Sequence, residues 1–227
     1  MHVPDGFIDA PVSLAAGAVA VAGVGVCLRG ARRELDDRTA PLAGLVAAFV
    51  FAAQLLNFPV AAGTSGHLLG GALAAALVGP YAGASCIAVV LLVQALFADG
   101  GLTALGVNVT NMSIVGLSVA YLTMRLLLAV LPRERWSVVV ASGAGALLSV
   151  PAAALGFVAF FAAGGTADVP IGTVASAMVS VHVLIGIGEA VVTGATVASV
   201  LAVRPDLVHA ARGLRTPLER RPSPVAA

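Results

Sequence analysis

The sequence predicts an all-α, polytopic membrane protein with seven transmembrane helices. Of the 227 residues, 59% are hydrophobic and 10% are charged, compared with about 25% charged residues in ordinary soluble domains. The mean hydropathy is +1.04, and the apolar residues form long runs separated by short polar breaks, which is the pattern of bilayer-spanning helices. This composition excludes an ordinary soluble domain, and no basic surface typical of nucleic-acid binding is present.

The first two spans are predicted at Val12–Leu28 and Leu42–Phe58. Residues 1–11 form a polar, Pro- and Gly-containing leader, and no positively charged segment of the kind that opens a signal peptide comes before the first apolar run. Arginines follow the first span, and Asn57 and Pro59 interrupt the end of the second.

The next apolar stretch, residues 68–97, is too long for one unstrained helix, and Gly79-Pro80 divides it. We expect a short third helix that ends near Val78 and a fourth that begins near Tyr81. The fifth helix, Leu105–Leu131, follows a glycine-rich loop at residues 99–101.

The sixth and seventh helices are predicted at Trp136–Ala163 and Thr173–Val203, which completes a membrane domain over residues 12–203. The remaining residues, 204–227, form a basic, proline-rich tail that we expect to be cytoplasmic and largely disordered. Cys27 and Cys86 lie in apolar runs without a partner at metal-ligand spacing, so packing explains both.

The arginines predict the orientation of the chain in the membrane. With seven spans and the N-terminus outside, the inner segments hold eleven of the twelve arginines, and the outer segments hold none. The outer segments carry aspartates instead: Asp5, Asp9, Asp99 and Asp168. The opposite orientation would violate the positive-inside rule, so we expect the C-terminus inside and the leader outside, in the same compartment as His67.

The leader begins Met1-His2-Val3-Pro4-Asp5-Gly6-Phe7 and carries the strongest chemical signal. A histidine at position 2 places the terminal amine, the His2 amide and the His2 imidazole in one short run. Ni²⁺ and Cu²⁺ favour square-planar nitrogen coordination and can displace an amide proton. A second imidazole would close the square, and His67 is the best candidate; the alternative is an accidental histidine on a frayed terminus.

Polar residues inside apolar helices are functional candidates because they are costly in a bilayer. Asn108 and Asn111 lie at i and i+3 on one helix face, where they would hold the leader, serve the outer shell of the metal or bond between helices. Glu189 is predicted to pair with Arg125 in a structural ion pair, and His182 is more readily explained as a core histidine than as a ligand.

Small residues on the second helix form two ladders, Ala43/Ala47 and Gly44/Ala48/Ala52. Small side chains at a spacing of four let helix backbones approach closely. Packing within the bundle is the more common role of this pattern, and a docking face for a membrane partner, at Ala43, Ala47 and Ala48, is the alternative.

Four stretches together resemble the CbiM/NikM family, the substrate-binding components of energy-coupling factor transporters for cobalt and nickel. They are Met1-His2-Val3-Pro4-Asp5-Gly6-Phe7, Gly63-Thr64-Ser65-Gly66-His67, the run Asp99-Gly100-Gly101 to Asn108 with Asn111-Met112, and Gly188-Glu189-Ala190 through Gly194. The resemblance covers residues 1 to about 203, and the motifs occur in family order.

The resemblance implies that the Met1 amine, the His2 amide and imidazole and the His67 imidazole bind Co²⁺ or Ni²⁺ as substrate, with no permanently bound cofactor. It also implies an extra N-terminal helix ahead of a six-helix core in the cell membrane. The expected partners are a transmembrane coupling subunit, two cytoplasmic ATPase subunits and a small auxiliary membrane subunit. The chain itself has no P-loop, so it is not expected to be an enzyme.

Two other functions stay open at this point. An ATP-independent, proton-coupled carrier or channel would use His182, Glu189 and Arg125 as a proton path, although such carriers usually show inverted repeats that are not found here. An intramembrane metalloenzyme would need clustered ligands around an open site, and neither HExxH nor a carboxylate pair occurs. The sequence does not choose between Co²⁺ and Ni²⁺.

Overall fold

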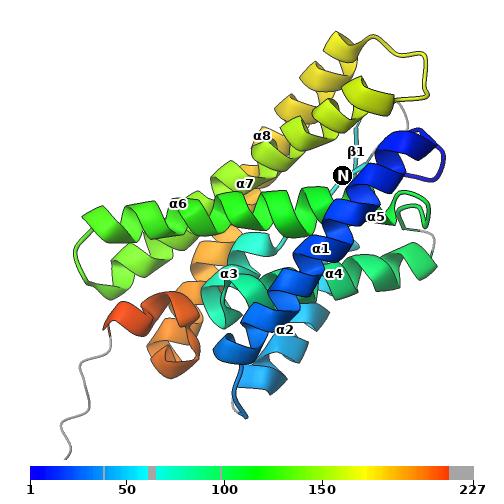
Figure 1. The fold of residues 1–227 in the computed structure, drawn as a ribbon. Helices are drawn as coiled ribbons and strands as arrows, with labels where there is room; N and C mark the ends of the chain where they lie inside the picture. The colour runs from blue at the N-terminus through cyan, green and yellow to red at the C-terminus, as the bar shows by residue number, and fades with distance from the viewer. Residues whose placement is uncertain (38, 61–64, 98, 215–227) are drawn as a thin grey trace, which may run out of the picture.

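The computed structural model describes residues 1–37, 39–60, 65–97 and 99–214, and these residues are mainly helical (Figure 1). The α-helices are α1 (Ala10–Glu34), α2 (Thr39–Gln54), α3 (Gly71–Val78), α4 (Pro80–Leu96), α5 (Leu105–Asn108), α6 (Leu117–Val130), α7 (Arg135–Gly164) and α8 (Ile171–Val203). A π-helical segment, η2 (Val109–Gly116), joins α5 to α6, and two short strands, β1 (Phe58–Pro59) and β2 (Ser65–Gly66), pair antiparallel.

Each predicted apolar span corresponds to a helical segment, but the segments differ in length. Four of those described are long and apolar enough to cross a membrane: α1, the continuous helix Leu105–Val130, α7 and α8. Helices α2 and α4 have 16 and 17 residues, and α3 has eight. Eight residues extend about 12 Å, less than half of the ~30 Å hydrocarbon core, so α3 alone does not cross the bilayer. The count of seven spans therefore stays a prediction.

Helix α3 lies at the centre of the bundle. All eight of its residues are buried, and it packs against α4, α7, α6 and α2. A helix that is apolar on every side is stable only inside a larger assembly, so α3 supplies the core around which the longer helices gather.

The break between α3 and α4 falls at Gly79-Pro80, as the sequence predicts. Gly79 has φ +102°, a conformation that side chains with a Cβ rarely adopt, and Pro80 occupies the first turn of α4. The Glu34 carboxylate, from the end of α1, accepts a hydrogen bond from the Ala82 N–H at 2.7 Å. A side chain distant in sequence thus caps α4.

The segment η2 connects three neighbouring helices. The Thr110 hydroxyl donates to the Ala16 carbonyl of α1 at 2.9 Å, and the Ser113 hydroxyl donates to the Ala84 carbonyl of α4 at 2.7 Å. The Asn111 amide donates to the Ala153 carbonyl of α7 at 2.9 Å. The sequence predicted one helix here and missed its π-helical turns, which often mark functional positions.

Helices α7 and α8 form a long antiparallel pair that extends beyond the rest of the bundle (Figure 1). After α8, the chain continues as two short 3-10 helices, η3 (Pro205–Leu207) and η4 (His209–Leu214). Val208 and Ala211 are buried against the bundle. The expectation of a largely disordered tail was therefore wrong for residues 205–214, and residues 215–227 lie outside the described part of the chain.

The two small-residue ladders of α2 face different surroundings. Ala43 is buried, and its carbonyl accepts a weak hydrogen bond from the Cys86 thiol at 3.4 Å, while Ala47 packs against the core. Ala48 is exposed, and a Cβ added at Gly44 would meet no atom within 4 Å. Ala43 and Ala47 therefore pack within the bundle, which corrects the proposed docking face Ala43/Ala47/Ala48 to its exposed part.

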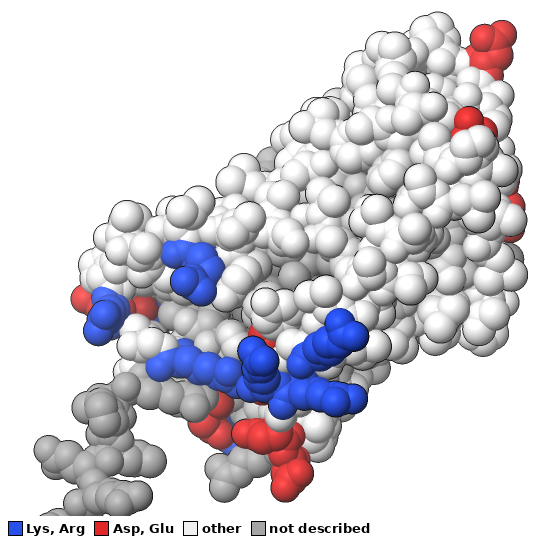
Figure 2. Space-filling view, in the orientation of Figure 1, with Lys and Arg blue, Asp and Glu red and all other residues white. Residues whose placement is uncertain are grey.

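The charged residues are distributed unevenly, as Figure 2 shows: arginines gather at one end of the molecule. They lie in the last two turns of α1, in the turn between α6 and α7, and after α8. The leader lies at the other end, where its main chain pairs with residues 164–166 at the α7–α8 turn. The orientation of this axis in the membrane stays a prediction.

Candidate metal centre

The first three residues lie inside the protein rather than on a frayed end. Met1 is 0% exposed and His2 is 5% exposed, and the N-terminus lies among α1, α5 and β1 (Figure 1). Asn108 holds this segment with both ends of its amide: its oxygen accepts from the Val3 N–H at 2.8 Å, and its nitrogen donates to the Val3 carbonyl at 3.1 Å. Asn108 therefore holds the leader in place, which is one of the three roles considered for it from the sequence.

Further contacts fix the rest of the leader. The Asp5 carboxylate accepts from the Thr103 N–H and hydroxyl at 2.7 and 2.6 Å, and these bonds lower the pKa of Asp5. The Thr166 hydroxyl donates to the Gly6 carbonyl at 2.6 Å. A Cβ at Gly101 would collide with Asp5, so a glycine is required where the 99–101 loop crosses the leader.

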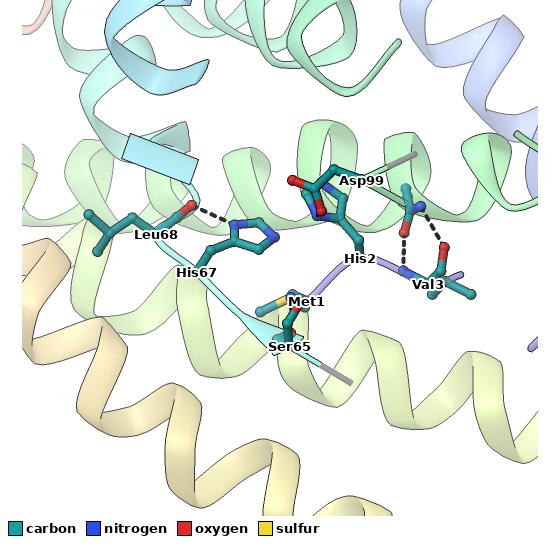
Figure 3. Close-up of polar contacts among 8 residues, drawn as sticks. Met1, His2, Val3, Ser65, His67, Leu68 and Asp99 are labelled. Atoms are coloured by element: carbon teal, nitrogen blue, oxygen red, sulfur yellow. Dashed lines mark hydrogen bonds and ion pairs between the residues drawn. The ribbon is translucent and has the colours of Figure 1, made fainter. Parts of the chain in front are cut away.

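The strands β1 and β2 bring His67 to the N-terminus. The Met1 amine donates a hydrogen bond to the Ser65 carbonyl of β2, and the His67 ring stacks on the His2 ring with centroids 4.3 Å apart and planes inclined by 25° (Figure 3). The structure thus brings together all three predicted ligand residues, although His67 is more than sixty positions from Met1 and His2 in the sequence. Gly63 and Thr64 of the same motif lie outside the described residues.

One nitrogen of His67 is already engaged. Nδ1 lies 2.8 Å from the Leu68 carbonyl oxygen. Because a carbonyl only accepts hydrogen bonds, Nδ1 must carry the proton, and in the neutral ring Nε2 then carries the lone pair. In the described part of the chain, Nε2 is buried and has no hydrogen-bond partner. Burial is the main cause that holds the pKa of His67 well below its usual value, so this nitrogen is free to bind a metal at neutral pH.

The terminal amine has a similar electrostatic environment. Burial lowers the pKa of the Met1 amine from 8.0 to about 4, although the Asp99 carboxylate favours the charged form. The amine is therefore neutral over the physiological range. A neutral amine, like a neutral imidazole, has the lone pair that metal coordination requires.

Asp99 is the residue near the site that sequence reasoning did not select. Its Oδ1 lies 3.3 Å from His2 Nδ1, and the hydrogen bond from His2 holds the pKa of Asp99 below its usual value. The sequence placed Asp99 only among the outer acidic residues. No local pattern indicates this contact, because the leader must fold back onto the 99–101 loop to make it.

Asn111 contacts the side chain of Met1. Its amide nitrogen is 3.9 Å from the Met1 sulfur, in addition to its bond to the Ala153 carbonyl. Asn111 therefore both packs against the first residue and links helices, which combines two of the roles that the sequence left open.

The predicted ion pair between Glu189 and Arg125 was wrong. Glu189 is buried and accepts two main-chain hydrogen bonds, from the Leu69 N–H at 2.5 Å and the Gly70 N–H at 2.9 Å. Arg125 is exposed, and its guanidinium donates to the Tyr121 hydroxyl at 3.1 Å. The carboxylate thus satisfies the N-terminus of α3 instead of a side-chain cation.

His182 is buried on α8 near the strand that carries His67. Its Nδ1 lies 2.6 Å from the Met178 carbonyl, and a Cβ added at Gly66 would approach its Nε2 to 3.1 Å. Within the described residues, Nε2 has no hydrogen-bond partner. His182 is therefore a core histidine with one satisfied nitrogen, close to the candidate site but behind Gly66.

Among the residues that the structure describes, no three His, Cys, Asp or Glu side chains form a group suited to a metal ion. A site built on His2 and His67 would therefore need main-chain donors as well, and the buried Met1 amine lies beside both rings.

Comparison with known proteins identifies the family. The model of the CbiM family, described as the cobalt uptake substrate-specific transmembrane region, matches residues 2–207. A putative fused nickel transport protein, NikMN, from Archaeoglobus fulgidus is 38% identical over 216 residues, which cover 92% of this chain and 68% of the relative. A putative metal transport protein from Haloquadratum walsbyi is 39% identical over 211 residues, which cover 92% and 93%.

A comparison with solved structures supports the same family. The crystal structure of a truncated transition metal transporter matches with a TM-score of 0.82 and 30% identity, over 89% of this chain and 99% of that one. The family model matches residues 2–207 of this chain, cobalt and nickel transport proteins are among its relatives, and it shares the fold of a transition metal transporter. The chain therefore belongs to the CbiM family.

Proposed function

We propose that this chain is the substrate-binding membrane subunit of an energy-coupling factor transporter that takes up Co²⁺ or Ni²⁺. The observation that carries the proposal is the buried cluster in which the Met1 amine, His2 and His67 meet. In the metal-bound state the amine, the His2 amide, the His2 imidazole and the His67 Nε2 form a square of four nitrogen donors.

The order of the donors follows from chelate geometry. The amine and the adjacent His2 amide close one small ring with the metal, and the His2 Nδ1 closes a second ring with the same amide. His2 Nδ1 faces Asp99, so its coordination to a metal would require the imidazole to give up that contact. The amide must lose its proton, so binding releases protons and strengthens as pH rises.

The surroundings support such a site in two ways. Burial keeps the amine and the His67 imidazole neutral, so neither must lose a proton before binding. Asn108 fixes the main chain at Val3, one residue beyond the chelate. Less conformational entropy is then lost when the metal binds.

ATP hydrolysis belongs to other chains in this proposal. The partners are a transmembrane coupling subunit, two cytoplasmic ATPase subunits and a small auxiliary membrane subunit, all in the cell membrane or at its inner face. The exposed small residues of α2, Gly44 and Ala48, form the face that approaches the coupling subunit, because side chains of this size permit close helix contact.

The alternative, a proton-coupled carrier that needs no ATP, is less well supported. Its proton path would run through His182, Glu189 and Arg125. The Glu189 carboxylate is instead engaged by two main-chain N–H groups, and Arg125 lies on the surface. Glu189 and Arg125 therefore belong to different local structures and do not form one proton path.

The metal site is tested by blocking the amine without changing the rest of the chain. The full-length protein is produced as an N-terminal fusion whose protease cleavage leaves Met1 as the first residue. We expect the uncleaved fusion to retain little Ni²⁺ or Co²⁺ and the cleaved protein to retain about one ion per chain. Metal content is measured by elemental analysis, and square-planar Ni²⁺ is recognised by its visible absorption and its diamagnetism.

His67→Ala and His182→Ala provide a matched pair of buried histidines. His67→Ala removes a ligand and should weaken binding by more than the roughly 10–100-fold caused by loss of an outer-shell partner, whereas His182→Ala should cost less than about tenfold. Equal metal binding before and after cleavage, or a larger loss in His182→Ala, would contradict the site. Uptake by vesicles with and without the ATPase subunits separates the ATP-driven transporter from the carrier.

A further inference from the structure

Two hollows that share lining residues lie near the arginine-rich end of the molecule. The larger has a volume of about 650 Å³ and lies between α3, α6, α7 and η4. Three arginines contribute to its wall, Arg125, Arg133 and Arg212, and none of the described residues that line it is an aspartate or glutamate. Its surface therefore attracts an anion.

The smaller hollow, of about 400 Å³, lies between α1, α4 and the η2–α6 helix. Its walls are mostly apolar, with Ile114, Leu117 and Leu122 among them, and Arg125 is the charged residue of its lining. Tyr121 and Arg125 line both hollows. The two volumes are each within the range of small-molecule sites.

Arg125 lines both hollows and is the charged residue that they share. It belongs to the candidate membrane span Leu105–Val130, five residues from its end, or about 7.5 Å along the helix. Its guanidinium donates to the neutral Tyr121 hydroxyl at 3.1 Å and lies 5.8 Å from the centre of that ring. No carboxylate among the described residues pairs with it. A cation at this depth is stable when it reaches the interface or meets an anion.

We propose that these hollows bind one anionic phospholipid. The phosphate lies in the larger hollow against Arg125 and Arg133, with Arg212 contributing its charge, and an acyl chain lies in the apolar groove along α4 and α6. Guanidinium groups recognise phosphate oxygens through paired, charge-assisted hydrogen bonds. Basic hollows between membrane helices are known to hold such headgroups.

The combination of features favours a lipid over other anions. A soluble phosphate would use the arginines but would gain nothing from the apolar groove. An acidic surface of a partner subunit would also meet the arginines, but it would leave the groove beside α1 and α4 unfilled. Only a ligand with a charged head joined to a long apolar chain complements both hollows at once.

The test uses the full chain, stripped of lipid in detergent and titrated with phosphatidylglycerol or phosphatidylcholine of identical acyl chains. Bound lipids are counted by native mass spectrometry. We expect one phosphatidylglycerol to bind at least about tenfold more tightly than phosphatidylcholine, and Arg125→Gln combined with Arg133→Gln to remove at least about tenfold of that affinity. Arg212 is left unchanged because it also donates to the Glu34 carbonyl.

Arg135→Gln is the matched control, since Arg135 is exposed at the same end and does not line either hollow. It should leave phosphatidylglycerol binding unchanged. Ser118→Phe fills the apolar groove and should weaken the binding of phosphatidylglycerol, while Ser118→Ala should leave that binding unchanged. Unchanged melting temperatures of the metal-free variants show that each one folds.

Three results would overturn the proposal. If phosphatidylcholine binds as tightly as phosphatidylglycerol, the arginines do not recognise the headgroup. If glycerol phosphate binds as tightly as phosphatidylglycerol, the site is one for soluble phosphate. Normal lipid binding in the Arg125→Gln/Arg133→Gln variant, together with loss of co-purification with the coupling subunit, would identify the hollow as a docking site for that partner.

Discussion

At the scale of single residues, the buried polar side chains mostly bond to main-chain groups rather than to one another. Asn108 bonds both main-chain groups of Val3, Glu189 accepts from Leu69 and Gly70, and Glu34 accepts from Ala82. Each contact lies where an irregular segment meets a helix, and an unpaired main-chain group there would be costly to bury. These side chains therefore make the irregular segments compatible with an apolar interior.

Glu189→Gln tests this role. Glutamine keeps the shape, but only one of its two terminal atoms accepts a hydrogen bond, so one of the Leu69 and Gly70 N–H groups loses its partner. We expect a loss of about 1–3 kcal/mol in the free energy of unfolding, visible as a lower melting temperature. Arg125→Gln, at an exposed position, should change it by less than about 0.5 kcal/mol.

The double variant distinguishes the main-chain role from an ion pair. If Glu189 and Arg125 do not interact, the two effects add. Recovery of stability when Arg125→Gln is added to Glu189→Gln would restore the ion-pair interpretation. All measurements are made in detergent without anionic lipid, so that ligands of Arg125 do not contribute.

The buried amine predicts a pH dependence of stability in the metal-free protein. The Met1 amine has an unfolded pKa of 8.0 and a folded pKa of about 4, so between these values the unfolded state binds more protons and the free energy of unfolding rises with pH. One such group contributes at most about 1.4 kcal/mol per pH unit. His67 acts in the same direction, but only below the ordinary histidine pKa of 6.5.

Comparing melting temperatures of the native and the N-terminally acetylated chain between pH 6.5 and 8 isolates the contribution of the amine, because all other groups titrate in both forms. We expect the slope of melting temperature against pH to be more positive in the native chain than in the acetylated chain. An equal slope in both forms would show that a different group titrates.

At the scale of elements, the small residues of α2 show how one pattern serves two surfaces. Ala43 faces the bundle, whereas Ala48 is exposed. Ala43→Leu should therefore overpack the contact with α4 and cost about 1–3 kcal/mol of stability, measured by thermal unfolding. Ala48→Leu should leave stability and metal binding unchanged and should reduce ATP-driven uptake if this face meets the coupling subunit. Full uptake by Ala48→Leu would exclude that docking face.

At the scale of the whole molecule, one end carries the arginines (Figure 2) and the other carries the leader (Figure 1). From the positive-inside rule we predict that the arginine-rich end lies in the cytoplasm. In a chain whose Cys27 and Cys86 are replaced by alanine, an impermeant thiol reagent added outside intact cells should label Asp168→Cys and miss Arg133→Cys. The opposite labelling would reverse the orientation and place the metal site on the inner face.

The sequence alone determined the class of the protein and the approximate positions of its helices, and it was sufficient to propose an amino-terminal metal site. Apolar runs are local properties, and Gly79-Pro80 stops a helix through its own backbone geometry. Likewise, His2 lies next to the terminal amine by covalent structure, so a chelate can be read without knowledge of the fold.

The tertiary structure decided which polar groups meet. His67 reaches the N-terminus because β1 and β2 turn the chain toward the buried leader, and Asp99 reaches His2 because the 99–101 loop crosses it. Glu189 binds the start of α3 rather than Arg125. In an apolar interior, a buried carboxylate binds whichever unsatisfied donors the packing brings within reach, and helix packing is a property of the whole chain.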